Sequence, residues 1–322
     1  MAAKFKWGLL STARINNSIL GGMQHSERGE IVAVGSRDKA RAEAFAAAKG
    51  VARAYGSYEE LLADPDIQII YNPLPNDLHK EWTIKALQAG KHVLCEKPFA
   101  LSLPDVDAMF AAAQSSGRVL AEAFMYRHHP KIIKLKELVE DGSIGQPILL
   151  RTSHSFRLER DTDIRWQPER GGGSLWDVGC YPVSLARYVF GAPERVHAWQ
   201  KVAASGVDGT FAATLYHSGD RVTQLDSSFQ VPFRSQAEVV GTDGVITVVR
   251  PFQPSTPEAS LTLRRGDREE TIELANPPVY WLEIEDMHDA ILTGATPRVT
   301  PAETRGHIET LLQLYEAARG QG

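Results

Sequence analysis

The segment from Lys6 to Ser36, KWGLLSTARINNSILGGMQHSERGEIVAVGS, decides the fold of this chain. Its apolar runs predict two buried strands, Lys6–Leu10 and Glu30–Ser36, and Asn16–His25 between them reads as a helix. A turn of small residues joins the first strand to the helix, where backbone N–H groups can approach a phosphate. The segment therefore predicts a βαβ unit that binds a dinucleotide.

The turn itself, Gly8–Ile15 (GLLSTARI), lacks the G-x-G-x-x-G pattern of many dinucleotide-binding folds. It reads G-x-x-S-x-A instead, with small residues at three useful places. An ordinary strand–turn–helix explains such a turn equally well. The position of the turn after the first strand and the length of the βαβ unit favour the dinucleotide interpretation.

The alternation of strands and helices continues to residue 123. Three further apolar runs predict strands: Ile67–Tyr71, His92–Cys95 and Val119–Phe124. Four other segments predict helices: Asp38–Lys49, Ser57–Ala63, Asp77–Ala89 and Leu103–Ser116. Strands that alternate with helices form a parallel sheet covered on both faces, so residues 1–123 are expected to form an α/β Rossmann domain.

A different pattern begins at residue 124. Long alternating stretches joined by turn residues predict a mostly antiparallel sheet: Ile148–Phe156, Arg195–Ala203, Thr210–His217, Arg221–Gln230, Gln236–Gly241, Val245–Arg250, Ser260–Arg264 and Glu270–Leu274. Four segments predict helices: Lys131–Asp141, Ser174–Phe190, Tyr280–Leu292 and Pro301–Ala318. Residues 124–322 are therefore expected to form a second domain of the α+β class, which binds substrate.

The composition excludes several classes of protein. Of the 322 residues, 43% are hydrophobic and 23% are charged, as in ordinary folded proteins. The net charge of −5 does not favour a nucleic-acid partner. No apolar run reaches the roughly 18 residues that span a membrane, and no signal segment precedes the first strand. Cys95 and Cys180 lack metal-ligand spacing. We therefore expect no metal site, no membrane partner and a cytoplasmic location.

The residues that end the second strand indicate which dinucleotide is bound. A site for NAD usually has Asp or Glu here, which binds the ribose 2′-hydroxyl. This strand ends in Gly35-Ser36-Arg37, and a serine hydroxyl and a guanidinium group both suit a 2′-phosphate. Asp38 is expected to cap the following helix. NADP is therefore favoured over NAD, with Ser36 and Arg37 as ordinary loop residues the alternative interpretation.

Lys97 is the first candidate catalytic residue. It follows the short strand His92–Cys95 and stands between Glu96 and Pro98. Ligands of doubly wound parallel sheets bind at the carboxyl ends of the strands, so a lysine at this position lies over the cleft. An ordinary ion pair between Glu96 and Lys97 is the alternative.

Asp177 and Tyr181 are the other candidates, in the glycine-rich segment Gly171–Tyr181 (GGGSLWDVGCY). Residues four apart lie on one face of an α-helix, so a carboxylate and a phenol are expected side by side. A helix with one satisfied polar pair is the alternative. His128 and His129 can be read as substrate contacts, but structural groups are the more frequent role of such histidines.

These motifs together resemble the glucose–fructose oxidoreductase, inositol dehydrogenase and rhizopine-catabolism family (Gfo/Idh/MocA). The stretches that carry the resemblance are Trp7–Ile15, Tyr58–Leu62, Ile70–His79, Ala89–Ala100, Glu122–His129 and Gly171–Tyr181. The pieces EKP and GGG-x-x-x-D-x-G-x-Y are specific in this order and spacing. The resemblance implies a Rossmann domain followed by a domain with a large open sheet that members commonly use for dimerisation. A homodimer or homotetramer is therefore expected.

The resemblance also implies roles for individual residues. Lys97 matches the lysine that contacts substrate and cofactor, and Asp177 matches the aspartate that helps to hold substrate. Many members end the second motif in His, whereas this chain has Tyr181. It is similar in this to a branch with dimeric dihydrodiol dehydrogenase, xylose dehydrogenases and glucose–fructose oxidoreductase, where Tyr is the acid–base group. The positions that match cofactor contacts are Gly8, Ser11, Thr12, Ala13, Arg14, Ile15, Ser36, Arg37, Leu74, Asn76, His79, Glu96, Lys97, Arg165 and Trp166.

A hydride-transfer reaction follows from this set of residues. Tyrosine has an ordinary pKa of about 10, and a nearby lysine lowers that pKa by favouring the phenolate. Tyr181 is then expected to exchange a proton with the substrate hydroxyl while hydride moves to or from the nicotinamide. The expected activity is an NADP-dependent oxidoreductase acting at C1 of an aldose or on a similar sugar or polyol. A trans-dihydrodiol dehydrogenase, a reductase of nucleotide-linked ketosugars and a non-catalytic NADP-binding sensor remain the alternatives.

Overall fold

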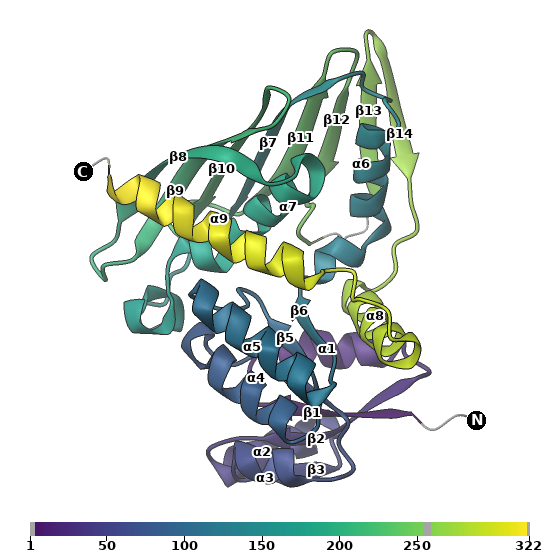
Figure 1. Cartoon of the computed structure of the whole chain (residues 1–322), viewed down its shortest axis with the longest axis vertical. Coiled ribbons are helices and arrows are strands. Elements are labelled where there is room, and N and C mark those ends of the chain that lie inside the picture. The colour runs from purple at the N-terminus through teal and green to yellow at the C-terminus, as the bar shows by residue number, and fades with distance from the viewer. Residues whose placement is uncertain (1–3, 254–258, 321–322) are drawn as a thin grey trace. The chain divides into compact units, whose positions relative to one another are not determined.

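The computed structural model describes residues 4–253 and 259–320, which form two compact units (Figure 1). The first unit contains the chain up to Met125 together with Pro277–Arg305. The second contains Tyr126–Asn276 and the chain from Gly306 onward. The predicted domains, residues 1–123 and 124–322, are consecutive in sequence, whereas the two units are not. The difference arises because a late helix packs on the first sheet.

A six-stranded parallel sheet forms the centre of the first unit, in the order β3-β2-β1-β4-β5-β6. Its strands are β1 (Phe5–Leu10), β2 (Gly29–Gly35), β3 (Arg53–Tyr55), β4 (Ile69–Asn72), β5 (His92–Glu96) and β6 (Leu120–Ala123). Its helices are α1 (Asn16–Met23), α2 (Lys39–Lys49), α3 (Tyr58–Ala63), α4 (His79–Gln88), α5 (Leu103–Ser116) and α8 (Val279–Thr293). This strand order is that of a dinucleotide-binding fold, and the predicted Rossmann architecture is confirmed.

Strand β3 is absent from the sequence-based prediction. It has only three residues, Arg53–Tyr55, and it pairs with β2 at the edge of the sheet. All three of its side chains are half-buried. A run this short shows no hydrophobic period, so nothing in the sequence distinguishes it from a loop.

Helix α8 completes the hydrophobic core of the first unit. Ile284 and Met287 of α8 pack in the same buried cluster as Trp7 of β1 and Tyr71 of β4. The indole Nε1 of Trp7 donates a hydrogen bond of 3.0 Å to Nε2 of His288, whose side chain is fully buried. This packing explains why α8 belongs to the first unit although it follows the second sheet in sequence.

The second unit is built on an eight-stranded sheet in the order β14-β13-β12-β11-β7-β10-β9-β8. Its strands are β7 (Pro147–Ser155), β8 (Pro193–Val202), β9 (Asp208–His217), β10 (Arg221–Ser228), β11 (Arg234–Gly241), β12 (Val245–Val249), β13 (Ser260–Arg265) and β14 (Arg268–Glu273). Strands β7 and β10 pair in parallel, and the other neighbours pair antiparallel. The predicted large, mostly antiparallel sheet is confirmed. The helices are α6 (Pro130–Glu140), α7 (Cys180–Phe190) and most of α9 (Pro301–Arg319).

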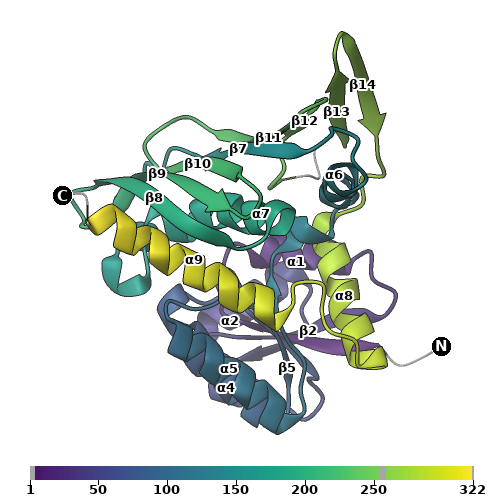
Figure 2. The same ribbon diagram turned by 45° about the horizontal axis from the view of Figure 1, so that its top comes forward.

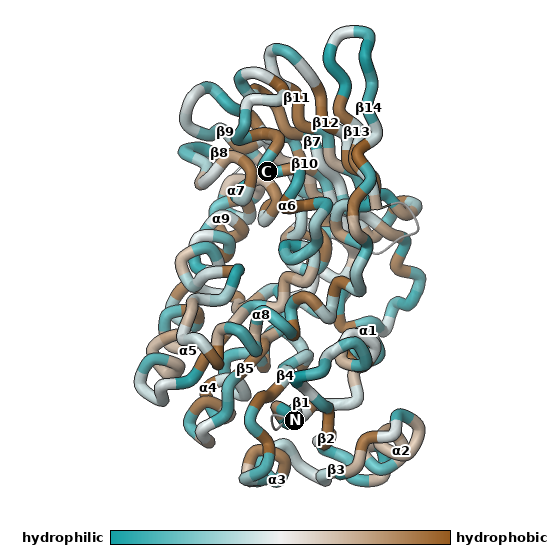
Figure 3. Tube along the Cα trace, turned by 90° about the vertical axis from the view of Figure 1, so that its right-hand side faces the viewer, coloured by the Kyte–Doolittle hydropathy of each residue, from teal (hydrophilic) through white to brown (hydrophobic). Residues whose placement is uncertain are grey.

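Side chains of this large sheet alternate between its two faces. In β9, Phe211 and Leu215 are fully buried, whereas Ala212 and Thr214 between them are only partly buried. Helix α7 packs against β7 and β10 on the buried face. Figure 3 shows hydrophobic and hydrophilic residues following one another along these strands, and a hydrophilic tip on the β13–β14 hairpin. The sheet is therefore covered by helices on one face and presents mixed, more polar side chains on the other.

Helices α1 and α8 lie side by side (Figures 1 and 2) and approach closely at one glycine. A Cβ atom at Gly22 would lie 2.7 Å from the backbone nitrogen of Trp281 in α8. No atom stands within 4 Å of a Cβ atom at the neighbouring Gly21. The pair provides an internal comparison between a crowded glycine and an open one on the same helix.

We expect Gly22→Ala to lower the free energy of unfolding by about 1–3 kcal/mol, because the methyl group forces α8 away from α1. The control Gly21→Ala should be neutral or stabilising by up to about 1 kcal/mol, because alanine is the better helix former. Urea unfolding followed by circular dichroism measures both. Equal shifts for the two variants would contradict the close packing of these helices.

Candidate active site

The turn after β1 is tied together at Ser11. This residue adopts a positive φ of 74°, and its N–H donates to the carbonyl of Gly35 at 2.8 Å. Its hydroxyl accepts from the Ala13 N–H at 3.2 Å, and its carbonyl accepts from Nδ2 of Asn16 at 2.8 Å. Helix α1 then starts at Asn16, with no acidic side chain in its first turn. A helix N-terminus without acidic neighbours suits an anionic group such as a pyrophosphate.

The end of β2 gathers a serine and two guanidinium groups. Ser36 is buried, and Asp38 caps α2 by accepting from the Arg41 N–H at 3.2 Å, as the sequence predicts. Burial raises the pKa of the Tyr58 hydroxyl, whereas the positive charges of Arg37 and Arg41 act in the opposite direction. Both arginines therefore lie near the same tyrosine. Arg41 was not among the predicted cofactor residues, although its place in the first turn after the cap at Asp38 was available as a signal.

His79 joins two loops at the carboxyl edge of the parallel sheet. Its side chain is fully buried, with Nδ1 2.9 Å from the carbonyl of Pro98 and Nε2 2.8 Å from the carbonyl of Leu74. Burial lowers the pKa of His79. The ring thus holds the loop after β4 against the loop after β5. Asn76, the next predicted contact, begins the short 3₁₀ turn Asn76–Leu78 that precedes α4.

Lys97 comes directly after β5, which ends at Glu96. One carboxylate oxygen of Glu96 accepts from the Tyr71 hydroxyl at 2.6 Å, and the other accepts from the Lys97 backbone N–H at 3.1 Å. The Lys97–Pro98 peptide bond is cis. Lys97 therefore stands at the carboxyl end of a central strand, on a backbone that Glu96 and Tyr71 fix.

In the second unit, Asp208 fixes the start of the glycine-rich segment. Its carboxylate accepts hydrogen bonds from the Ser174 hydroxyl at 2.8 Å, the Leu175 N–H at 2.7 Å and the Tyr315 hydroxyl at 2.7 Å. Gly173 has φ of 121°, a conformation that side chains rarely adopt, and a Cβ atom there would collide with this carboxylate. The glycine is required so that the chain can turn tightly around Asp208.

The helix after this turn differs from the predicted one. Leu175–Gly179 form a π-helical turn, and the α-helix α7 starts only at Cys180. The prediction of a single α-helix through Asp177 and Tyr181 is therefore wrong, because Asp177 lies in the π-helical turn and Tyr181 in the first turn of α7. Turns of this kind occur frequently at functional sites.

Asp177 pairs with another predicted site residue. Its carboxylate accepts from Nε of Arg165 at 2.7 Å, and Arg165 also lies 3.2 Å from Asp163. The negative charge of Asp177 raises the pKa of the Arg165 guanidinium above its ordinary value. The ring of Trp166 meets Phe229 edge-on at 5.3 Å. The structure thus brings Asp177 and Arg165 together within the second unit.

Tyr181 lies in an aromatic cluster and is only 7% exposed. Its ring is 5.7 Å from that of Tyr126, 5.4 Å from that of His154 and 5.5 Å from that of Phe252. Packing on three sides fixes the orientation of the phenol ring. Sequence reasoning did not identify His154 or Phe252, because they come from β7 and from a loop after β12, and no local pattern connects them.

The sequence alone does not decide whether His128 and His129 contact substrate or stabilise the fold, and the structure indicates a role for His129. His129 caps α6, since its ring accepts from the Lys131 N–H at 3.1 Å, and its other nitrogen lies 3.3 Å from Asn276. His129 is therefore a structural group. His128 is also buried, and it ends the preceding short helical turn, Met125–His128.

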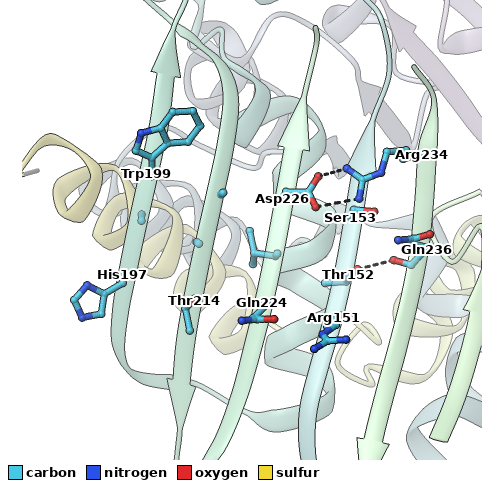
Figure 4. A pocket seen from close by; sticks show the side chains of 14 residues that line it. Arg151, Thr152, Ser153, His197, Trp199, Thr214, Gln224, Asp226, Arg234 and Gln236 are labelled. Atoms are coloured by element: carbon cyan, nitrogen blue, oxygen red, sulfur yellow. Dashed lines mark hydrogen bonds and ion pairs between the residues drawn. The ribbon is translucent and has the colours of Figure 1, made fainter. Parts of the chain in front are cut away.

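The more polar face of the large sheet is hollowed by about 560 Å³ (Figure 4). Neighbouring strands contribute polar side chains to this hollow, and an ion pair of 2.7 Å joins Arg234 to Asp226 across it. Trp199 at its margin is 53% exposed. The hollow contains none of the predicted catalytic residues.

No helix in the part of the chain that the structure describes has the length and apolar character to cross a membrane. Within residues 4–253 and 259–320, no three His, Cys, Asp or Glu side chains cluster where they could hold a metal ion.

The strand order and the turn after β1 define a dinucleotide-binding protein, and comparison with known proteins gives its family. Residues 5–124 match the oxidoreductase family with the NAD-binding Rossmann fold, and residues 132–247 match the GFO/IDH/MocA C-terminal domain. The chain belongs to this GFO/IDH/MocA oxidoreductase family, and it is an oxidoreductase. The family resemblance that the motifs predict is confirmed.

Individual relatives cover most of the chain. It is 39% identical over 316 residues to D-xylose 1-dehydrogenase (NADP(+)) 2 of Haloferax volcanii, covering 97% of each protein. It is 37% identical over 256 residues to trans-1,2-dihydrobenzene-1,2-diol dehydrogenase of Xenopus laevis, covering 76% of this chain and 74% of that one. A 3-ketoreductase from Actinomadura kijaniata, solved with NADP and TDP-benzene, is 27% identical, with a TM-score of 0.91 and 98% of each chain covered.

Proposed function

We propose that this chain is an NADP-dependent dehydrogenase or reductase that acts at C1 of an aldose or at an equivalent hydroxyl or carbonyl of a sugar. The observation that carries the proposal concerns Tyr181, the tyrosine that ends the glycine-rich motif. Its phenol ring is enclosed by an aromatic cluster, which fixes the orientation of the ring. The D-xylose 1-dehydrogenase of Haloferax volcanii, which matches nearly the whole chain, supports the substrate class.

The residues at the end of β2 fit a cofactor with a 2′-phosphate. Ser36 offers a hydroxyl, and the exposed Arg37 and Arg41 offer two guanidinium groups near Tyr58. An acid at this point would repel the phosphate, and the nearest one, Asp38, is turned to the helix N-terminus as a cap. We propose that these three residues hold the 2′-phosphate and that the Ser11 turn with the start of α1 holds the pyrophosphate.

We infer a division of roles among Tyr181, Lys97 and Asp177 during the reaction. NADP, when bound, accepts or supplies the hydride. Tyr181 takes the proton of the reacting hydroxyl in oxidation and returns it to the oxygen in reduction. The Lys97 ammonium group stabilises the negative charge that develops on this oxygen. Asp177, oriented by Arg165, accepts a hydrogen bond from a neighbouring substrate hydroxyl.

Two related substrate classes and one non-catalytic role compete with this proposal. The trans-dihydrodiol dehydrogenase of Xenopus laevis and the 3-ketoreductase of Actinomadura kijaniata favour a diol or a nucleotide-linked ketosugar. Reduction of NADP⁺ by aldoses and trans-dihydrodiols, and oxidation of NADPH by nucleotide-linked ketosugars, both followed at the nicotinamide absorbance, separate these classes. Tight NADP binding without turnover of any of them would instead indicate a sensor. A cytoplasmic location is part of the proposal, supported by Cys95 and Cys180, which are buried and are not joined in a disulfide.

We expect Tyr181→Phe to lower kcat by about 10²–10⁴-fold, because it removes the group that exchanges the proton. The Kd of NADP should change little, since the phenylalanine ring keeps the packing of the aromatic cluster. Initial rates and fluorescence titration measure the two quantities. Tyr216→Phe on β9 removes a phenol elsewhere in the same unit and should leave both unchanged. Wild-type turnover in Tyr181→Phe would rule out the proposed role.

We expect Arg37→Ala to raise the KM for NADP about 10–100-fold while the KM for NAD stays nearly constant, because it removes one charge-assisted contact to the 2′-phosphate. Arg41→Ala should act in the same direction. Lys49→Ala, in the last turn of the same helix α2, is the matched control for loss of an exposed positive charge. Equal effects on NADP and NAD would count against a phosphate site at this strand end.

We also propose that the chain forms a homodimer or homotetramer through the open face of the large sheet. We expect a second copy of this chain to bind at the hollow in this face. The shape of the hollow, the polar groups on its neighbouring strands and the exposed ring of Trp199 at its margin support this partner.

Ala212→Arg places a charged side chain in the middle of this face, beside Trp199 in the neighbouring strand. We expect light scattering after size exclusion to show dissociation into monomers. Glu270→Arg on the edge strand β14 should keep the wild-type mass. An unchanged mass for Ala212→Arg would place the interface elsewhere.

A further inference from the structure

Helix α8 carries a buried carboxyl group that the proposed mechanism does not use. The side chain of Glu283 is only 2% exposed. Neither of its carboxylate oxygens has a hydrogen-bond partner among the residues that the structure describes. An ionised carboxylate in such a place would be costly, because neither a cation nor an N–H group compensates for the lost water.

The charged groups that act on Glu283 are acids. Burial raises the pKa of its carboxyl well above the ordinary value, and the negative charges of Glu96 in β5 and Asp286 in α8 raise this pKa further. Burial raises the pKa of the Tyr71 hydroxyl in β4. Electrostatic interactions with Glu96, with Tyr280 of α8 and with Glu283 itself raise this pKa further. These five residues form an acid cluster at the carboxyl end of β4 and β5, all within the first unit.

The cluster cannot relax by movement of α8. This helix is held against α1 at Gly22, and His288 accepts the hydrogen bond of Trp7 one turn and a half further on. Glu96 is equally fixed, because Tyr71 and the Lys97 backbone N–H occupy its two oxygens. Glu283 must therefore lower its energy by holding a proton and not by turning toward solvent.

We propose that Glu283 is a positioning residue of the active site that holds a proton at neutral pH, loses it at alkaline pH, and acts on Lys97 through Glu96. While Glu283 is neutral, the end of β5 carries the single negative charge of Glu96 beside Lys97. Ionisation adds a second negative charge, which holds the proton of Lys97 more tightly and reduces the positive potential that this lysine offers to a developing alkoxide. The inference about the reaction rests on the proposed role of Lys97.

The first arm of the test measures stability and needs no activity. A carboxyl whose pKa is raised in the folded state binds a proton there that the unfolded chain has already released. Folding stability therefore falls as the pH rises from the unfolded pKa of about 4.3 to the folded pKa. Glu283→Gln mimics the protonated acid and lacks this loss. Glu283→Met, apolar and similar in length, serves as the second variant if the glutamine is poorly folded.

We expect the unfolding constant of wild type relative to Glu283→Gln to rise about tenfold per pH unit above pH 5, until Glu283 ionises in the folded state. Glu43→Gln, which removes an exposed acid on α2, should run parallel to wild type at every pH above 5. Parallel curves for Glu283→Gln as well would overturn the proposal, because they would mean that Glu283 is ionised in the folded chain at neutral pH.

The second arm measures the charge coupling to Lys97. Modification of Lys97 by an amine-reactive reagent, followed by mass spectrometry across pH 7–11, reports the loss of its proton. We expect the midpoint for Lys97 to lie at lower pH in Glu283→Gln than in wild type, and the alkaline limb of kcat/KM to move with it. Coincident midpoints would overturn the positioning role. Failure of the proposed reaction would appear separately, as absent turnover with both arms still readable.

Discussion

Parallel strands joined by right-handed crossovers all end at one edge of their sheet, and the first unit depends on this constraint. The ends of β1, β2, β4 and β5 bring together residues that are far apart in sequence: Ser11, Ser36, Leu74 and Lys97. Hydrogen bonds between the loops then fix what the topology has gathered. Ser11 is tied to the last residue of β2, and the ring of His79 connects the loops that follow β4 and β5. The sheet topology thus brings these residues close together, and a few buried polar groups fix the conformation of the loops that carry them.

The second unit reaches the same end by a different means. Its mostly antiparallel sheet has strand ends at both edges, and one buried carboxylate from β9, Asp208, holds the start of the segment that carries Asp177 and Tyr181. The π-helical turn that follows changes the direction of successive side chains. Asp177 faces Arg165, while Tyr181 enters the aromatic cluster. The motif GGG-x-x-x-D-x-G-x-Y records this geometry, because a side chain at Gly173 would occupy the place of Asp208.

Most strands and helices follow from the sequence, since their hydrophobic period is set by neighbours in the chain. The exceptions share a physical cause, which is dependence on residues far away. The edge strand β3 exists only because β2 offers it hydrogen bonds. The π-helical turn begins where Asp208 of β9 binds the Leu175 N–H, and the enclosure of Tyr181 needs His154 and Phe252 from other elements. Lys97, Asp177 and Tyr181 were identifiable as candidates because motifs are local, whereas the role of Glu283 depends on side chains from other elements that surround it.

The place of α8 in the fold has a consequence for how the chain is made. During synthesis the six strands of the first sheet leave the ribosome early, but the helix that covers Trp7 and Tyr71 emerges only after the entire second sheet. Until then an apolar face of the nascent Rossmann sheet stays uncovered, and such a surface is prone to aggregate or to bind a chaperone. Neither unit is therefore complete until both sheets have been synthesised. A ribosome that stalls within the second sheet leaves the apolar face of the first sheet exposed.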